Sequence, residues 1–280
     1  MSKGYPNFYD RMMKNIASYD LKSFFLFFGL DCIPYFSIAN EVVDGGLNLS
    51  LLDLPVCTSK GIVNFEFQFD RDEADDRRFI RYGVQLYEKY GFPVMSVVID
   101  FKAQEDEPFP IEISKGCVFT IYVKSLNERN PDIVLNNIND KLAINEKPLG
   151  KDLTGLKLLP FLDLDRKIEL LDKATEVLFS LDKNLVGLRE IKHLMRVIMF
   201  YSHQWNYEEN LDRLGRWSIM VDDLSQDAVV HFGKVNRKKG REERSYEVAR
   251  YMIDDGFSAE DVSKYSRLDL SIVNQLMLMK

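Results

Sequence analysis

One short run with regular alternation constrains the fold of this 280-residue chain more than any other segment. From Val63 to Phe69 the sequence reads Val-Asn-Phe-Glu-Phe-Gln-Phe, so apolar and polar side chains alternate. Successive side chains of a β-strand point to opposite faces of the sheet. The run therefore predicts a strand whose apolar face is buried and whose other face carries Asn64, Glu66 and Gln68.

A second acid lies in the apolar run just before this strand. Leu51–Val56 can pair with the strand as a hairpin through a turn at Cys57–Gly61, and Asp53 then lies close to Glu66. Two carboxylates and an amide that meet at a sheet edge suit a hard cation such as Mg²⁺. The alternative is that Glu66 and Gln68 are ordinary polar side chains on the wet face of a half-exposed strand.

These residues form part of a longer array. Asp53, then Glu66-x-Gln68, then Arg78-x-x-x-Tyr82 after an acidic segment resembles the recombination-promoting nuclease family. Members of that family are often labelled transposases and belong to the PD-(D/E)XK nuclease superfamily. Three further segments are similar to the family's pattern and extend the resemblance over most of the chain: Asp10–Lys14, Leu153–Leu162 and Gly256–Leu276.

The resemblance implies a Mg²⁺-dependent DNA endonuclease acting in recombination or transposition, with Mn²⁺ as a possible substitute ion. Asp53 and Glu66 would bind the ion together with the carbonyl of Phe67, and Asp53, Glu66 and Gln68 would be the catalytic residues. Gln68 stands where the superfamily motif has a lysine. A glutamine can orient water by hydrogen bonds but contributes no positive charge. Asp10 is a weaker candidate, because an acid on the N-terminal helix contributes in some superfamily members.

Arg78 and Tyr82 are four residues apart and therefore share one face of a helix. The resemblance implies that this face looks toward the site or binds the phosphates of DNA. The alternative is an exposed arginine stacked on a tyrosine. Leu52 occupies the place of the usual proline before the aspartate, and the acids in residues 70–76 would repel DNA. These departures keep open a catalytically degenerate binding or regulatory module, and also a purely structural protein without a metal.

The order of predicted elements agrees with an α+β fold. We expect the αβββαβ order of the nuclease superfamily, a mixed sheet flanked by helices, followed by a mostly helical C-terminal region. The expected elements are a helical region over 9–28, a connector over 34–38, hairpin turns at 44–46 and 59–61, an acidic loop over 70–76, a helix from Arg77 to Tyr90, a strand over 94–101 and a strand pair over 111–113 and 118–123. Phe79, Val84, Leu86, Tyr87 and Tyr90 are the expected apolar positions of that helix.

The character of the sequence changes after about Pro131, where helical periodicity dominates. Residues 147–160 contain two prolines and two glycines, which is typical of a linker. We therefore expect a nuclease-like domain over 1–146 and a helical domain over 147–280. The basic run Lys234–Arg244 is either a solvated helix end or an arm that contacts phosphates. Ser258 is a candidate N-cap for the first of two short C-terminal helices, which we expect to form a packing hairpin.

Composition narrows the classes of function. The formal net charge of -7 works against loose binding to nucleic acid, although a local basic groove and a bound metal can dominate a site. The three cysteines and three histidines lack zinc-ligand spacing, and no run is long enough to span a membrane. Without a recognisable signal sequence, a cytoplasmic location is expected. A homodimer is a further expectation, since many nucleases that cut both strands act as dimers.

Overall fold

The computed structural model describes residues 6–43, 49–69, 71–222 and 245–278, the last range with gaps at 247–248, 251 and 254–255. Contacts between residues divide the chain into two compact units, Met1–Leu211 and Asp212–Lys280. The boundary expected near residue 147 lies inside the first of these units. No helix in the described part of the chain is long and apolar enough to cross a membrane.

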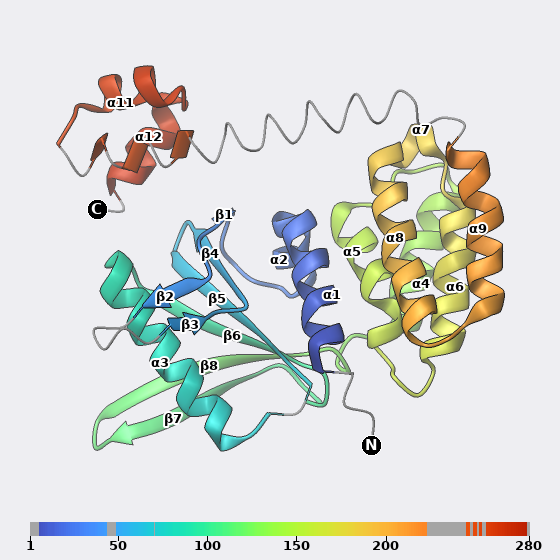
Figure 1. Cartoon of the computed structure of the whole chain (residues 1–280), viewed down its shortest axis with the longest axis horizontal. Helices are drawn as coiled ribbons and strands as arrows, with labels where there is room; N and C mark the ends of the chain where they lie inside the picture. Colours follow the sequence, from blue (N-terminus) through green and yellow to red (C-terminus); the bar gives the residue numbers. More distant parts are fainter. Residues whose placement is uncertain are drawn as a thin grey trace. The chain divides into compact units, whose positions relative to one another are not determined.

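A mixed sheet forms one side of the first unit, beside a group of helices (Figure 1). Within the described residues it has six strands in the order β1-β4-β5-β6-β8-β7. The parallel pairs are β5–β6 and β6–β8, and the other neighbours are antiparallel. The strands are β1 (Pro34–Ser37), β4 (Leu54–Thr58), β5 (Gly61–Gln68), β6 (Val94–Asp100), β7 (Glu107–Ser114) and β8 (Cys117–Ser125), and a separate antiparallel pair joins β2 (Glu41–Val43) to β3 (Leu49–Leu51). The α+β class and the mixed sheet expected from the sequence are confirmed.

The β4–β5 hairpin forms as the sequence predicts. Leu54 pairs with Phe65 at its open end, and Thr58 pairs with Gly61 at the turn. Gly61 has a φ of +115°, and a Cβ added there would lie 2.2 Å from the carbonyl oxygen of Pro93, so only glycine fits. One expectation was wrong: Pro34–Ser37 is not a connector but edge strand β1, where a proline is tolerated at the first position.

Helices cover both faces of the sheet (Figure 1). Helices α1 (Pro6–Tyr19) and α2 (Leu21–Phe27) pack on the side where the Phe65 ring meets the edges of Phe24 and Phe25. Helix α3 (Glu73–Tyr90) covers the opposite face, where Ile62 packs in one cluster with its apolar side chains. The alternation of β5 is therefore confirmed. Its polar face is nevertheless buried beneath α3 and not wet.

Helix α3 begins one turn earlier than the sequence predicted. Three acidic residues of the expected loop, Glu73, Asp75 and Asp76, lie in its first turn. Asp72 caps the helix, and Asp75 completes a reciprocal capping box. Acidic side chains near a helix N-terminus interact favourably with the helix dipole, and this interaction outweighs their loop-like composition. The helix ends at Gly91, with φ +70°, as predicted. Of the expected apolar positions, Phe79 and Leu86 are buried, whereas Val84 and Tyr87 are 47% and 58% exposed.

Beyond the sheet the first unit is helical. Its elements are α4 (Pro131–Ala143), α5 (Gly150–Leu158), the 3-10 turn η1 (Leu159–Phe161), α6 (Lys167–Ser180), α7 (Lys183–Val186) and α8 (Leu188–Gln204), and α9 (Glu208–Asp222) begins there. The Phe161 ring lies at the centre of an aromatic cluster, with ring centroids 5.3 Å from Tyr9, 5.3 Å from Phe101 and 4.9 Å from Tyr201. This cluster joins α1, the end of β6 and α8.

The prediction of a linker over residues 147–160 was wrong, because helix α5 occupies most of this range. Its glycines mark close packing between helices. A Cβ at Gly150 would lie 2.0 Å from Ser23 Oγ, and one at Gly155 would lie 2.9 Å from Val134 Cγ1. The glycines that suggested a flexible connection are therefore needed for the close approach of neighbouring helices.

The second unit contains α11 (Ala259–Ser266) and α12 (Leu270–Leu278), with Ser258 Oγ accepting a hydrogen bond from the Asp261 N–H as the predicted cap. Its apolar cluster consists of Ala249, Ile253, Val262, Leu268 and Val273. The basic run Lys234–Arg244 and the predicted turn at 44–46 lie outside the described residues.

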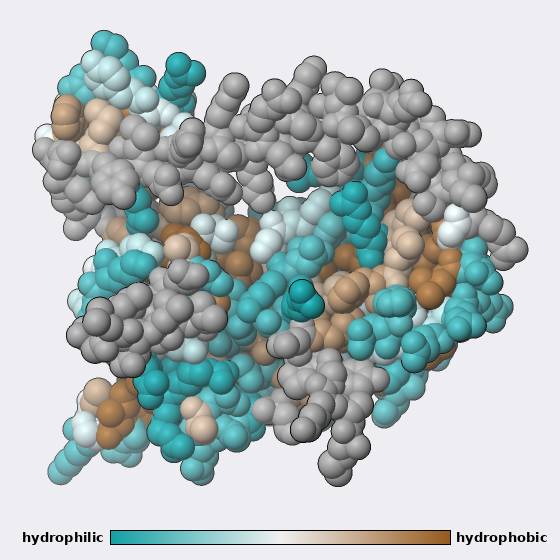
Figure 2. All heavy atoms as spheres, viewed as in Figure 1, coloured by the Kyte–Doolittle hydropathy of each residue, from teal (hydrophilic) through white to brown (hydrophobic). Residues whose placement is uncertain are grey.

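Apolar side chains also reach the surface at the end of the β7–β8 hairpin. Figure 2 shows apolar atoms at the lower left, where this hairpin ends in Figure 1. Ile113 and Val118 stand on either side of the turn and are 53% and 57% exposed.

Candidate functional site

The β4–β5 hairpin brings the two predicted acids together. Asp53 directly precedes β4, and because Leu54 pairs with Phe65, the continued register places Asp53 opposite Glu66. Asp53 Oδ2 accepts a hydrogen bond of 2.9 Å from the Phe67 N–H. The charge of Asp53 also acts on the Glu66 carboxyl group. A side chain from the loop and one from the strand therefore share one corner of the sheet.

Glu66 is a buried acid in a polar setting. It is 2% exposed, and Asn64 Nδ2 donates a hydrogen bond of 3.0 Å to its Oε1 atom. Burial, and after it the charge of Asp53, raises the pKa of Glu66 to about 8, against the opposing effects of Asn64 and Arg78. A carboxyl group in this position gains its charge most readily when a further cation is brought beside it.

Helix α1 contributes two charged side chains to the same corner. Lys14 Nζ lies 2.8 Å from Asp53 Oδ1 and 2.9 Å from Asp10 Oδ1. Burial lowers the pKa of Lys14, but its hydrogen bonds to Asp53 and Asp10 more than offset this, so the pKa is raised overall. Burial, followed by smaller effects that include the charge of Asp53, raises the pKa of Asp10. Asp10, named from the resemblance, is therefore a neighbour of Asp53.

Lys14 was not singled out from the sequence as a functional residue. Its spacing of four from Asp10 indicates a helical ion pair, and this signal was present in the sequence. The sequence carried no signal for the contact between Lys14 and Asp53, because this contact joins the first helix to a loop far along the chain.

Arg78 and Tyr82 of α3 face Glu66 from the other side. Arg78 Nη1 forms an ion pair of 2.9 Å with Asp75, and the arginine's charge acts on both Glu66 and Tyr82. Tyr82 is 9% exposed, and the guanidinium group of Arg78 lies 5.3 Å from the centroid of the Phe79 ring. Burial, and after it the charge of Glu66, raises the pKa of Tyr82.

Gln68 lies at the end of β5, half-buried and paired in register with Asp100 of β6. It follows Glu66 on the same face of the strand. Phe67 was predicted to bind the metal through its carbonyl oxygen. In the structure its N–H group donates a hydrogen bond to Asp53.

The carboxylate oxygens near Asp53 and Glu66 are of the kind that a hard cation prefers, but few side chains supply them. In the described part of the chain, no group of three or more His, Cys, Asp or Glu side chains is arranged to hold a metal ion. Mg²⁺ in proteins is usually bound by one or two carboxylates and keeps several waters. Asp53 and Glu66 supply carboxylates of the type and number that this smaller requirement names.

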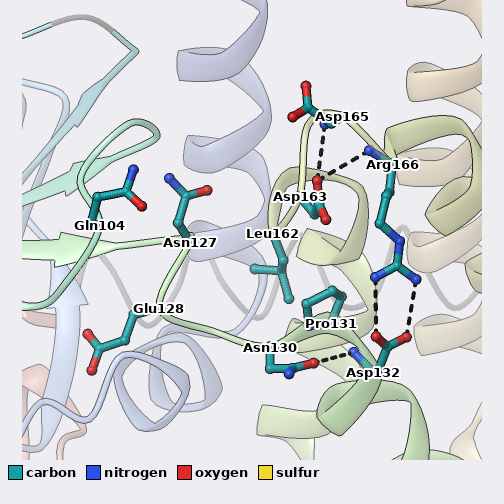
Figure 3. A pocket seen from close by; sticks show the side chains of 10 residues that line it. All are labelled: Gln104, Asn127, Glu128, Asn130, Pro131, Asp132, Leu162, Asp163, Asp165 and Arg166. Carbon is teal, nitrogen blue, oxygen red and sulfur yellow. Dashed lines mark hydrogen bonds and ion pairs between the residues drawn. The ribbon is translucent and has the colours of Figure 1, made fainter.

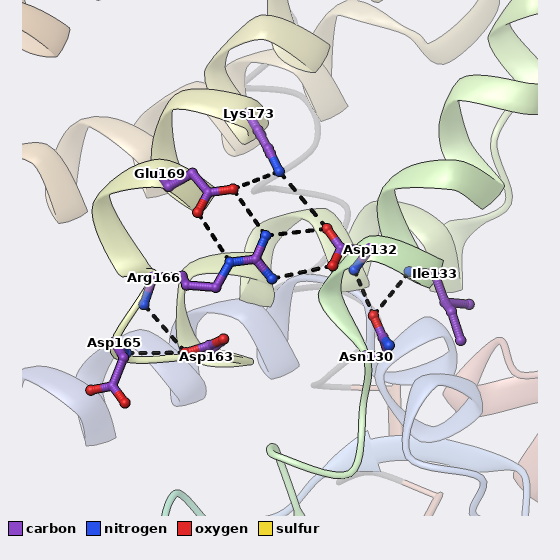
Figure 4. Close-up of polar contacts among 8 residues, drawn as sticks. All are labelled: Asn130, Asp132, Ile133, Asp163, Asp165, Arg166, Glu169 and Lys173. Atoms are coloured by element: carbon purple, nitrogen blue, oxygen red, sulfur yellow. Dashed lines mark hydrogen bonds and ion pairs between the residues drawn. The ribbon is translucent and has the colours of Figure 1, made fainter.

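A separate hollow of about 610 Å³ lies between the sheet's loops and the helices, away from the predicted site residues (Figure 3). Its charged groups largely bind one another. Arg166 donates to both carboxylate oxygens of Asp132, at 3.2 and 3.3 Å, and also pairs with Glu169 (Figure 4). Asp163 Oδ1 accepts from the N–H groups of Asp165 and Arg166. This network joins the start of α4 to the start of α6.

No family model, no curated protein and no solved structure matches this chain.

Proposed function

We propose that this chain is a Mg²⁺-dependent DNA endonuclease that hydrolyses phosphodiester bonds in recombination or transposition, with a core of the PD-(D/E)XK type. The observation that carries the proposal is the convergence of Asp53 and Glu66 at the β4–β5 hairpin. The parallel β5-α3-β6 crossover supports the same assignment, because it agrees with the αβββαβ order implied by the resemblance.

The residues at this corner have separable roles in the proposal. Asp53 and Glu66 would hold Mg²⁺ or Mn²⁺ together with the carbonyl oxygen of Phe67. The bound ion would polarise the phosphate and lower the pKa of a bound water. Gln68 would orient the attacking water by hydrogen bonds.

Arg78 and Tyr82 would bind the DNA phosphates next to the scissile bond. A local phosphate-binding group is needed because the net charge of -7 provides no overall electrostatic attraction between the chain and DNA. A cytoplasmic location, and a homodimer that places one site on each strand of the DNA, belong to the same proposal.

A second candidate is a nuclease-like binding module that has lost the reaction. The observation that favours it is the engagement of Asp53, whose two oxygens bind the Lys14 ammonium and the Phe67 N–H.

A plasmid assay separates the two candidates. Supercoiled plasmid is incubated with the full chain and Mg²⁺ or Mn²⁺, beside Asp53→Ala, Glu66→Ala and the control Asp31→Ala. Asp31 is a suitable control because it is fully exposed and forms an ion pair with Lys60 at the surface. Nicking by the wild type and by Asp31→Ala alone supports the nuclease. DNA binding without any cleavage supports the module.

A further inference from the structure

The strand motif of the proposed nuclease lacks a positive charge. Glu66 is followed two residues later by the neutral Gln68, where the resembled superfamily has a lysine. Hydrolysis of a phosphodiester places additional negative charge on the phosphoryl oxygens in the transition state, and a fixed cation there lowers the barrier. A cation supplied from another element can meet this need.

Lys14 is a cation placed at this corner by α1. That helix is fixed on the sheet by fully buried side chains, among them Met13 at 0% and Ile16 at 1% exposure. Its ammonium group is 2.8 Å from Asp53 Oδ1, and the Lys14 side chain is 31% exposed, so the group can be reached from solvent. Arg78 acts on Glu66 from the side of α3 and forms an ion pair with Asp75 there.

The ion pair of Lys14 with Asp10 fixes the direction of the ammonium group. Lys14 Nζ lies 3.0 Å from Asp10 Oδ2 and 2.9 Å from Asp10 Oδ1. The lysine therefore bridges the helix to the loop that carries Asp53. Asp10 therefore positions the ammonium group of Lys14, and this role does not require Asp10 itself to contact the substrate.

We infer that Lys14 is a catalytic residue of this chain, which supplies from α1 the positive charge missing from the strand motif; the inference rests on the proposed nuclease function. In the reaction, the oxygen of water forms a bond to phosphorus and one P–O ester bond breaks. The attacking water loses a proton to solvent, and the departing sugar oxygen takes one from solvent. Lys14 stays protonated throughout and stabilises the charge on the phosphoryl oxygens.

The experiment compares Lys14→Met, Lys14→Gln and the double variant Lys14→Met/Gln68→Lys with the wild-type chain. Lys14→Gln is included because a glutamine can still donate hydrogen bonds to the neighbouring carboxylates without the charge. Lys60→Met is the matched control, since Lys60 forms an ion pair of the same 2.8 Å length with Asp31 at an exposed site. The measurements are kcat and KM for plasmid nicking with Mg²⁺, and Mn²⁺ affinity by calorimetry.

We expect both single variants at position 14 to lower kcat about 100-fold, the typical loss for one group that stabilises transition-state charge. Their Mn²⁺ affinity should stay equal or increase, because a cation competing for Asp53 has been removed. Adding Gln68→Lys should restore kcat at least tenfold, and Lys60→Met should match the wild type.

A structural ion pair predicts a different pattern. Lys14→Gln would then cut like the wild type, or activity and Mn²⁺ binding would fall together and Gln68→Lys would not restore them; either result overturns the inference. If the wild-type chain neither cuts DNA nor binds Mn²⁺, the proposed function itself fails. If the wild type cuts and Lys14→Gln cuts equally fast, only the role of Lys14 is rejected.

Discussion

The side-chain amide of Asn64 donates a hydrogen bond to Glu66 Oε1 at 3.0 Å, and the two side chains are 0% and 2% exposed. They are successive residues on the face of β5 that α3 covers. A buried carboxyl group with this donor is held in one orientation, which suits a metal ligand.

Replacing Asn64 by leucine should destabilise the fold by about 1–3 kcal/mol, the usual cost of leaving a buried polar partner without its hydrogen bond. Urea denaturation measures this change in the free energy of unfolding. Asn136→Leu, on the exposed side of α4, is the control and should stay within about 0.5 kcal/mol of the wild type. Equal stability of the Asn64 and Asn136 variants would contradict a structural role for the Asn64–Glu66 bond.

Mg²⁺ should stabilise the wild-type chain against unfolding, because an ion that binds only the folded state shifts the equilibrium by mass action. At a Mg²⁺ concentration about 100 times the Kd, the gain is about 2.7 kcal/mol. Glu66→Gln should abolish this gain, whereas Glu88→Gln, on the exposed face of α3, should keep it. Thermal melts with Mg²⁺ and with chelator test this. A gain of the same size in Glu66→Gln would exclude Glu66 as a metal ligand.

Gly155→Ala should destabilise the first unit by about 1–3 kcal/mol, the typical cost of overpacking. The added methyl group would lie 2.9 Å from Val134 Cγ1 and 3.0 Å from the Phe27 ring. Gly215→Ala in α9 meets nothing within 4 Å and should be neutral or stabilise by up to about 1 kcal/mol, as alanine favours a helix. Denaturation midpoints measure both. A neutral Gly155→Ala would show that α4 and α5 can move apart at little cost.

His193 should make the fold sensitive to acid. Burial, followed by the charge of Lys157, lowers its pKa to about 3, and the ring binds Asn15 and stacks on Tyr19. In the unfolded chain the histidine takes up its proton at its ordinary pKa of 6.5, so the unfolded state gains protons first as the pH falls. Its contribution to stability is complete above pH 6.5 and is lost between 6.5 and about 3, at no more than about 1.4 kcal/mol per pH unit.

The test of this acid sensitivity is the free energy of unfolding as a function of pH. His193→Gln should flatten the slope over that window, because a glutamine does not titrate. His203→Gln is the control, since His203 is exposed on α8. A slope unchanged in His193→Gln would assign the acid sensitivity to other groups.

Local patterns in the sequence were sufficient for the sheet around the candidate site. The alternation from Val63 to Phe69 predicted β5, and the turn before Gly61 predicted the hairpin that brings Asp53 beside Glu66. These features depend on residues close together in the chain, so short-range rules describe them well.

Features that depend on distant contacts could not be predicted in this way. Gly150 and Gly155 suggested a linker. In the structure a side chain at these positions would meet Ser23, Phe27 or Val134, and no local pattern in the sequence reveals such contacts. The contact between Lys14 and Asp53 is of the same kind. The burial of Asn64 and Glu66 depends on α3 closing over the polar face of β5.

The position of Phe161 has a consequence for dissecting the chain. A fragment that stops after α4 would lose Phe161 and Tyr201 together, so Phe8 at the start of α1 would lose its contacts with both rings and Tyr9 its contact with Phe161. Lys14 lies less than two turns further along the helix whose start these contacts hold. A truncated protein that keeps every acid of the proposed nuclease motif would for that reason be a poor substitute for the longer chain.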